Sequence, residues 1–316
     1  AAWQGPVNEK DDPYGDGKSE EGLQPMKHVQ EMQLLEGKDF EKIKEAVFRY
    51  GGVQTAIYSA LDYPEKQSPY YNSEKFAYCY MGAEKPNHEI TIIGWDDSYP
   101  KENFKMKVEG DGAFLCLNSW GEDFGEQGVF YVSYYDVNIG VHNVVYTRIE
   151  EADNYDHIYQ SDLCGWVGQL GYNKDSLYGA NVYTAQSKET LRAAGFYATG
   201  KETSYELYVV KNFENTDSLE NRILVAEGSL MNAGYYTIDF EKECQVEPGE
   251  KYAVILHITT PGSVHPIAIE YAADELTEDV DLADGEGYIS AGGTKWESTE
   301  EKQGCNLCLK VYTDDR

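Results

Sequence analysis

Residues 112–136 read GAFLCLNSWGEDFGEQGVFYVSYYD, and residues 87–97 read NHEITIIGWDD. Both segments contain apolar runs of strand length, and a polar loop rich in Lys, Glu and Gly joins them. Glycine adopts the backbone conformations of tight turns at little steric cost, so Gly121, Gly125 and Gly128 predict a tight turn into a further strand. The two segments therefore predict an antiparallel hairpin that is followed by a third strand.

The register of this hairpin decides which side chains meet. If the hairpin is symmetric about residues 103–104, the numbers of opposed residues sum to 206. Side chains alternate between the two faces of a sheet, so pairs two residues apart share one face. This register predicts three pairs on one face: His88 with Asn118, Ile90 with Cys116, and Ile92 with Phe114.

A histidine beside a carboxamide has a recognised chemical use. The carboxamide holds the ring in one orientation, and the second ring nitrogen is then free to take a proton from a thiol. The thiolate–imidazolium pair that results is an activated nucleophile, in which the thiol pKa falls from about 8.5 to about 3–4. Trp120 is expected to cover the contact between His88 and Asn118 and to exclude water from it.

These residues resemble the His and Asn regions of the papain family of cysteine peptidases. In that family a His precedes an apolar strand and Gly-Tyr/Trp, and an Asn-Ser-Trp-Gly segment with spaced glycines follows. The resemblance implies His88 as general base, Asn118 as the residue that orients it and Trp120 as the shielding indole. It also implies walls of a specificity pocket near Pro86 and Glu89.

The segment before the histidine fits the same resemblance. Residues 38–50, KDFEKIKEAVFRY, have helical spacing of apolar side chains, and Gly51-Gly52 is a plausible end of the helix. The strand-like GGVQTAIYSA follows. Residues 1–150 are therefore similar to the second half of a papain-like α+β domain with an antiparallel, barrel-like sheet. The members of the helical stripe are Phe40, Ile43, Ala46 and Val47.

None of the six cysteines fits the family's nucleophile, which lies upstream of the histidine in a Gln-x-x-x-x-x-Cys-Gly-x-Cys-Trp type of segment. Cys79 precedes His88 without a helix start behind it, and Cys116 is expected to be a packing residue of the sheet. Cys305 and Cys308 form a lone CxxC, which lacks the second pair of a zinc site and the helix of a redox motif. The chain alone is expected to be inactive.

Three explanations stay open for the missing cysteine. The chain can be the light part of a nicked peptidase whose companion polypeptide carries the cysteine, a truncated fragment, or an inactive scaffold. The start at AAWQGPVNE, without an initiator Met or signal peptide, favours a processed product or a fragment. The main hypothesis is therefore a thiol protease that hydrolyses protein or peptide bonds. The alternative is a catalytically inactive surface binding or adhesion protein.

A change in the sequence pattern near residue 151 predicts a second domain at 151–316. Short alternating runs such as YELYVV, GYYTIDF and KYAVILHI recur between Gly, Asp and Asn turns, as is typical of an all-β sandwich. Residues 155–313 resemble the lectin-like domain that follows the papain module in clostridial-type bacterial surface cysteine peptidases. The resemblance implies a structural calcium, with Glu270 and nearby acids as ligands that the sequence does not assign, and a cell-wall or glycan ligand.

The aromatic residues of this second domain are expected to be core rather than a sugar platform: Trp166, Tyr178, Tyr183 and Trp296. No cofactor is expected for catalysis itself. The net charge of −30 disfavours binding to nucleic acids and to anionic membranes, and no window approaches the length of an apolar membrane span. This charge suits a protein that is secreted or displayed on a bacterial cell surface.

Overall fold

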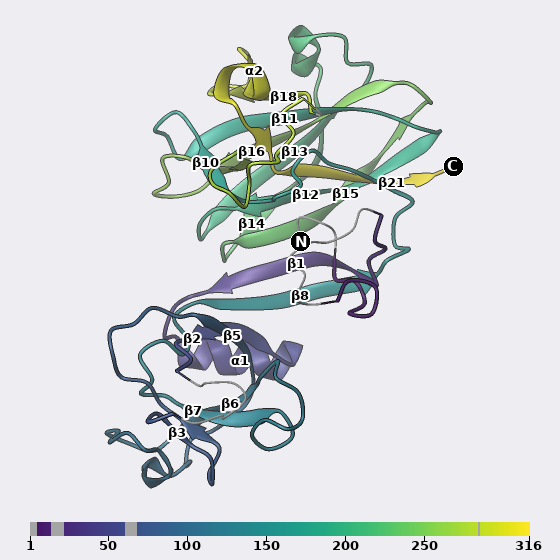
Figure 1. The fold of residues 1–316 in the computed structure, drawn as a ribbon. Coiled ribbons are helices and arrows are strands. Elements are labelled where there is room, and N and C mark those ends of the chain that lie inside the picture. Colours follow the sequence, from purple (N-terminus) through teal and green to yellow (C-terminus); the bar gives the residue numbers. More distant parts are fainter. Residues whose placement is uncertain (1–4, 14–21, 61–67, 284) are drawn as a thin grey trace. The chain divides into compact units, whose positions relative to one another are not determined.

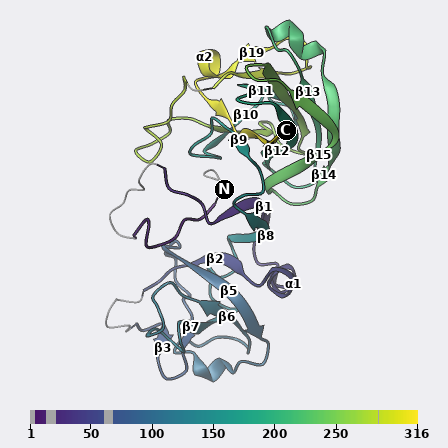
Figure 2. The same ribbon diagram turned by 90° about the vertical axis from the view of Figure 1, so that its right-hand side faces the viewer.

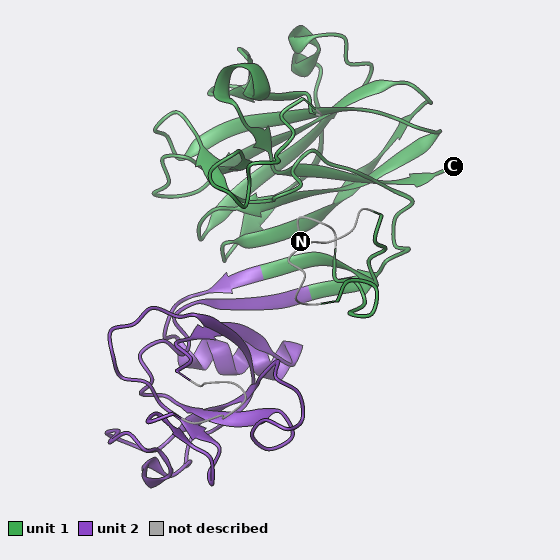
Figure 3. Cartoon of the chain, in the orientation of Figure 1, with its two compact units in different colours: residues 1–32, 148–316 green, residues 33–147 purple. Residues whose placement is uncertain are grey.

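The computed structural model describes residues 5–13, 22–60, 68–283 and 285–316. The chain divides into two compact units, which are drawn in different colours in Figure 3. One unit comprises Gln33–Thr147, and the other comprises residues 1–32 with Arg148–Arg316. The boundary expected between residues 150 and 151 stays a prediction, and the two units are described separately.

The unit at Gln33–Thr147 is built on one sheet with a single α-helix, α1 (Phe40–Tyr50), packed against it. Neighbouring strands are antiparallel except for the parallel pair β4 and β7. The order of the strands is β3 (Tyr71–Asn72), β4 (Ala77–Tyr78), β7 (Val129–Ser133), β6 (Ala113–Leu117), β5 (His88–Asp96), β2 (Val53–Ile57) and β8 (Asn143–Glu151). A short 3-10 helix, η1 (Lys101–Asn103), lies in the loop between β5 and β6.

Helix α1 forms where the sequence predicts it. The Asp39 carboxylate caps its first turn by accepting a hydrogen bond from the Lys42 N–H at 3.1 Å. Gly51, at a φ of 91°, ends it in the left-handed conformation that glycine favours. The predicted stripe faces the sheet, with Ile43 fully buried in the core of this unit.

The predicted hairpin register is wrong by two residues. Ile92 pairs with Cys116, and Thr91 with Leu117, so the paired numbers sum to 208 instead of 206. A bulge between Ile92 and Gly94 then shifts the pairing by one more residue, and Phe114 lies opposite Trp95. The symmetric-hairpin assumption fails because the bulge and the irregular loop with η1 place different numbers of residues on the two sides.

The second unit is an all-β sandwich, as the sequence predicts (Figures 1 and 2). One layer contains β1 (Lys27–Leu35), β15 (Gly234–Val246), β12 (Glu189–Ala198), β21 (Leu309–Asp315) and β9 (His157–Tyr159). The facing six-stranded sheet runs β14 (Ile223–Leu230), β13 (Thr203–Val210), β16 (Lys251–Thr259), β11 (Ser176–Thr184), β18 (Gly287–Ser290) and β19 (Glu297–Ser298). A small third sheet contains β10 (Gly168–Leu170), β17 (Ile267–Glu270) and β20 (Asn306–Leu307). Two short helices complete the unit, η2 (Thr216–Glu220) and α2 (Thr299–Gln303).

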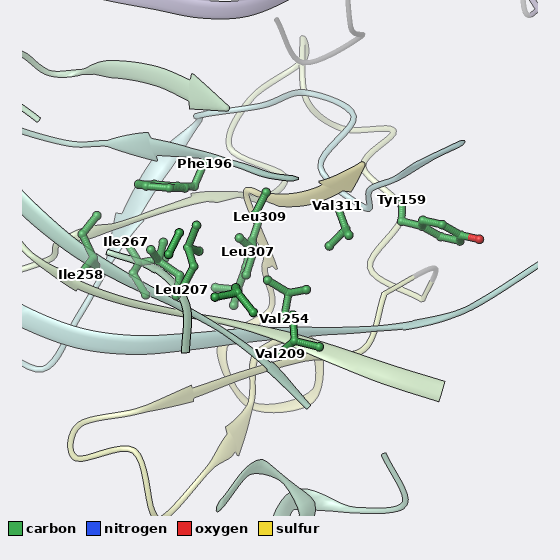
Figure 4. Packing of buried hydrophobic residues seen from close by; sticks show 14 of the residues in the cluster. Tyr159, Phe196, Leu207, Val209, Val254, Ile258, Ile267, Leu307, Leu309 and Val311 are labelled. Atoms are coloured by element: carbon green, nitrogen blue, oxygen red, sulfur yellow. The ribbon is translucent and has the colours of Figure 1, made fainter. Parts of the chain in front are cut away.

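The main core of the sandwich lies between its layers (Figure 4). Phe196 of β12 and Val311 of β21 pack in one cluster with Leu207 and Val254 of the facing sheet. A second buried cluster, with Ala180 and Ile255, lies on the outer face of the six-stranded sheet because alternate residues point to opposite sides.

The four aromatic residues expected to be core all contact buried clusters. Tyr183 packs against the main core, and its hydroxyl donates to the Leu309 carbonyl at 2.7 Å. Trp166 packs beside Tyr197, with ring centroids 5.8 Å apart. The other two, Tyr178 and Trp296, pack on the outer face of the six-stranded sheet.

Candidate active site

The sheet of the unit at Gln33–Thr147 brings His88 and Asn118 into direct contact. His88 is the first residue of β5, and Asn118 follows the last residue of β6. The His88 Nε2 atom lies 2.8 Å from the Asn118 Oδ1 atom. Asn118 is 6% exposed and His88 is half-buried, so the hydrogen bond lies at the edge of the core.

The hydrogen bonds around Asn118 determine the state of the imidazole. The backbone N–H of Ser119 also donates to Asn118 Oδ1, at 2.8 Å. A backbone N–H can only donate, so the atom between the two groups is the carbonyl oxygen and not the amide nitrogen. His88 Nε2 must therefore carry a proton, and in the neutral ring Nδ1 is the basic nitrogen. This contribution of Ser119 was not predicted, because it comes from a backbone N–H, which every residue except proline carries.

Trp120 lies against the histidine ring. The ring centroids of His88 and Trp120 are 5.0 Å apart at an angle of 38°, and the centroids of Trp120 and Phe124 are 5.2 Å apart in a T-shaped arrangement. Apolar rings in this position reduce the access of water to one side of the imidazole. Trp120 therefore lies beside the His88 ring, and its role as a shielding indole over the contact with Asn118 stays a prediction.

The glycine-containing turn fixes these two side chains. Gly128 accepts a hydrogen bond from the Asn118 N–H at 2.9 Å, which closes the turn behind the active-site residues. Gly125 has a φ of 61°, and a Cβ atom there would lie 2.2 Å from the Val129 carbonyl oxygen. Only glycine fits this position without moving the backbone. The turn thus requires glycine for a steric reason.

Pro86 and Glu89 flank the histidine in different ways. Pro86 is half-buried and lies just before β5. Glu89 is exposed and points to the opposite face of β5 from His88, because side chains alternate along a strand. Its carboxylate accepts a hydrogen bond from Gln54 at 3.4 Å and lines a shallow surface hollow that extends to Asn118 and Leu117.

The two cysteines of this unit have environments that disfavour a thiolate. Cys116 is fully buried in the core, and burial raises the pKa of its thiol well above the ordinary value. Cys79 is also fully buried, and burial together with the charge of Asp136 raises its pKa to about 12. Neither thiol meets the requirement of a lowered pKa for a catalytic cysteine.

The four cysteines of the sandwich show the same trend. Burial raises the pKa of Cys244, Cys305 and Cys308, and none of the six cysteines forms a disulfide bond. Cys164 is the exposed member of the set, and partial burial and the charge of Glu270 raise its pKa.

A buried group of oxygen atoms in the sandwich fits the expected calcium. The fully buried Glu270 carboxylate accepts hydrogen bonds from the Cys164 N–H at 2.6 Å and from Asn306 Nδ2 at 2.8 Å. Asn306 Nδ2 also lies 2.9 Å from the Ser161 carbonyl and 2.8 Å from the Asp281 carbonyl, although an amide nitrogen has only two hydrogens. Asn306 Oδ1 is buried and has no partner among the described residues.

Exchanging the oxygen and nitrogen of the Asn306 amide would direct its oxygen at the Glu270 carboxylate and the carbonyls of Ser161 and Asp281. Carboxylate, amide and carbonyl oxygens are the ligands that calcium prefers. The set contains one carboxylate only, and within the described part of the chain no group of three or more His, Cys, Asp or Glu side chains is placed to hold a metal. The residues present therefore fit a hard cation and not a zinc-type site.

Comparisons with known proteins give a match for each part of the chain. Residues 2–149 match the model of the papain family cysteine proteases, and residues 158–313 match that of the lectin like domain. A search of curated proteins by sequence found no match. No helix in the described part of the chain has the length and apolar character needed to cross a membrane.

Two solved structures resemble the whole chain. One is a variant of the clostridial cysteine protease Cwp84 after propeptide cleavage, with a TM-score of 0.83 and 26% identity over 100% of this chain and 80% of that chain. The other contains the cysteine protease and lectin-like domains of Cwp84, a surface layer associated protein of Clostridium difficile, with a TM-score of 0.81 and 25% identity over 100% of this chain and 71% of that chain. The expected combination of a papain-like fold with a lectin-like fold is confirmed.

Proposed function

We propose that the chain is the histidine-bearing part of a cysteine endopeptidase, because residues 2–149 match the model of the papain family cysteine proteases and residues 158–313 match that of the lectin like domain. The observation that carries this proposal is the 2.8 Å hydrogen bond from His88 Nε2 to Asn118 Oδ1. It leaves Nδ1 of the imidazole as the atom that takes a proton from a thiol.

In the proposed reaction, His88 Nδ1 accepts the proton of a cysteine thiol, and the thiolate attacks the carbonyl carbon of a peptide bond. His88 then gives this proton to the leaving amine, and an acyl-enzyme remains. His88 next takes a proton from water, the resulting hydroxide attacks the thioester, and the proton returns to the thiolate as the acid leaves. Asn118 holds the ring orientation through each transfer, and Trp120 limits access of water to the ring.

The nucleophile of this reaction is proposed to lie on a segment outside the 316 residues. The two thiols of the protease unit are fully buried and have raised pKa values, so they are poor nucleophiles. A segment that carries the cysteine, on a companion polypeptide or in the same precursor, would complete the site. The similarity to Cwp84 supports this proposal, since both matched Cwp84 chains extend beyond the part that this chain covers.

Glu89 is proposed to influence which side chains the enzyme accepts. Its exposed carboxylate lines a hollow that borders Asn118 and accepts a hydrogen bond from Gln54. A carboxylate in this position attracts a Lys or Arg side chain of the substrate and repels an acidic one. Pro86 would form a rigid wall beside His88.

The similarity to a surface layer associated protein also supports a place at a bacterial cell surface, where the substrates would be proteins. A structural calcium held by Glu270, Asn306 and the carbonyl of Ser161 is proposed for the lectin-like domain. It would stabilise that domain and take no part in peptide hydrolysis.

Native material tests the proposal directly. It is treated with an irreversible thiol-reactive epoxide, digested and analysed by intact mass and peptide mass. The expected result is one labelled cysteine on a polypeptide or segment outside residues 1–316, together with hydrolysis of fluorogenic peptides. A His88→Ala variant should abolish both, and a Ser119→Ala variant, which keeps the backbone N–H, should retain both.

The second candidate function is an inactive scaffold that binds a surface ligand through the lectin-like domain. The burial of both thiols in the protease unit favours it over a complete enzyme within this chain. The same experiment distinguishes the two. Native material without a labelled cysteine and without peptide hydrolysis would exclude the peptidase and leave the scaffold.

A further inference from the structure

The outer face of the six-stranded sheet carries a row of polar side chains that neither the protease reaction nor the calcium site uses. Four strands contribute one residue each, directly opposed in register: Glu227 of β14, Glu206 of β13, His257 of β16 and Tyr178 of β11. Directly opposed residues point to the same face of a sheet. The face is the outer one, because the neighbouring residues Leu207 and Leu256 point into the main core.

A second row, made only of hydroxyl side chains, lies two residues further along the same strands. Because the side-chain period of a strand is two, this row shares the outer face with the first. Its members are Ser229 of β14, Ser204 of β13, Thr259 of β16 and Ser176 of β11. The Thr259 hydroxyl donates to Ser176 Oγ at 3.1 Å.

The centre of the first row is held rigidly. The His257 ring stacks on Tyr178 with centroids 3.9 Å apart and an angle of 3°. Its Nδ1 atom lies 2.6 Å from Glu206 Oε2, and its Nε2 atom lies 2.9 Å from Ser176 Oγ. The hydrogen bond from His257 lowers the pKa of Glu206, which is therefore ionised at neutral pH. Binding of a ligand to these side chains therefore costs little conformational entropy, because they are already ordered.

The two carboxylates of the row have different surroundings, because Glu206 contacts His257 and also lies in the field of the Arg222 guanidinium. Glu227 lies directly opposite Glu206, and like charges in this arrangement destabilise a sheet. Glu227 is exposed and has no hydrogen-bond or ion-pair partner among the described residues. Beside the pair is a surface hollow lined by Ser204, Tyr205, Glu206, Glu227, Gly228, His257 and Thr259.

The chemistry of this hollow defines its ligand. Two carboxylates favour a cationic group and exclude phosphates and acidic sugars. The hydroxyls of Ser204 and Thr259 offer donors and acceptors to a ligand that itself carries many hydroxyls. Tyr205 adds a third hydroxyl to the lining, and three hydroxyls match a ligand rich in hydroxyls better than the apolar stem of a lysine. We propose that this hollow binds a saccharide that carries a free amino group, with the ammonium at Glu227 and Glu206.

This inference does not rest on the proposed peptidase function, since the site lies wholly within the lectin-like domain. The test titrates the full chain by calorimetry, at physiological salt, with a tetramer of glucosamine and with its fully N-acetylated counterpart. The two ligands differ in their amino groups and share their hydroxyls. Glu227→Gln removes one carboxylate of the hollow, and Glu301→Gln removes an exposed carboxylate of α2, which packs at the opposite edge of the six-stranded sheet, as a matched control.

The expected result is binding of the glucosamine tetramer, at least tenfold weaker binding of the N-acetylated tetramer, and at least a fivefold loss of affinity in Glu227→Gln. Glu301→Gln should bind like the wild type. Equal losses in both variants would mean general attraction to a strongly acidic protein and would overturn the proposal. Equal affinity for the two tetramers, or preference for a lysine-rich peptide of the same charge, would overturn the assignment of the ligand. Peptidase activity plays no part in these readouts, so either proposal can fail alone.

Discussion

Replacing Asn118 by Ala tests how the proposed active site works. The change removes the hydrogen bond from His88 Nε2 and leaves the cysteine-bearing segment untouched. A neutral hydrogen bond contributes about 0.5–1.5 kcal/mol, which corresponds to a roughly 2- to 13-fold change in rate. We expect kcat to fall by this factor with KM unchanged, because Asn118 orients the base and does not hold the substrate.

The free energy of unfolding should change little in the same variant. Asn118 Oδ1 accepts two hydrogen bonds, which the variant loses. Its Nδ2 atom, however, is buried without a partner in the described structure, and such a group costs about 1–3 kcal/mol. The two effects offset each other, and the expected net change is below about 1 kcal/mol.

The measurement combines steady-state hydrolysis of a fluorogenic peptide by the complete peptidase with urea unfolding of the same preparations. Ser119→Ala is the control, because it keeps the backbone N–H that donates to Asn118. A loss of kcat above a hundredfold, or a rise in KM at constant kcat, would refute the reasoning that Asn118 acts only by holding the imidazole. A large loss of stability would show that Asn118 is mainly a structural residue.

Three further predictions concern the buried groups. Cys116→Ala should leave peptide hydrolysis by the complete enzyme intact and lower the free energy of unfolding by about 1 kcal/mol, as measured by activity and urea unfolding. Lys310→Met leaves the fully buried Asp162 without its 2.6 Å partner and should cost about 3–5 kcal/mol at pH 7. Burial raises the pKa of Asp162, and the charge of Lys310 lowers it, so Lys310→Met should raise the pKa of Asp162 further. The loss of unfolding free energy relative to the wild type should therefore shrink as the pH falls through this raised pKa. Calcium at a hundred times its Kd should stabilise the lectin-like domain by about 2.7 kcal/mol in calorimetry, a chelator should remove this gain, and Glu270→Gln should abolish it.

Capping residues and the spacing of apolar side chains predicted helix α1 and the strands of the sandwich, because these elements depend on neighbouring residues in the sequence. The N-cap at Asp39 and the glycine after Tyr50 mark the ends of α1, and the intervening apolar stripe is the face that the helix buries. The short alternating runs of the second half predicted a sandwich because one face of each strand must meet a core. These features need no knowledge of how distant segments meet.

Features built from distant backbone atoms left no such signal. The oxygen group around Asn306 includes the carbonyls of Ser161 and Asp281, and any residue type supplies a carbonyl. The polar row that includes Glu227 and His257 requires the registers of three strand pairs at once. The alternation of each strand shows that these side chains face outward, but it does not show which of them are opposed.

The contact between His88 and Asn118 was predicted from a register that proved wrong, and the parity of the error explains why. Side chains repeat every two residues, so a slip of two leaves every residue on the same face, whereas a slip of one would have moved His88 to the opposite face. The observed pairing of Thr91 with Leu117 is such a slip of two. Beyond Leu117 the ladder ends, and the turn held by Gly128 brings the Asn118 side chain back to the imidazole. The apolar alternation therefore determines which face of the sheet carries His88, and the glycine turn determines the distance between His88 and Asn118.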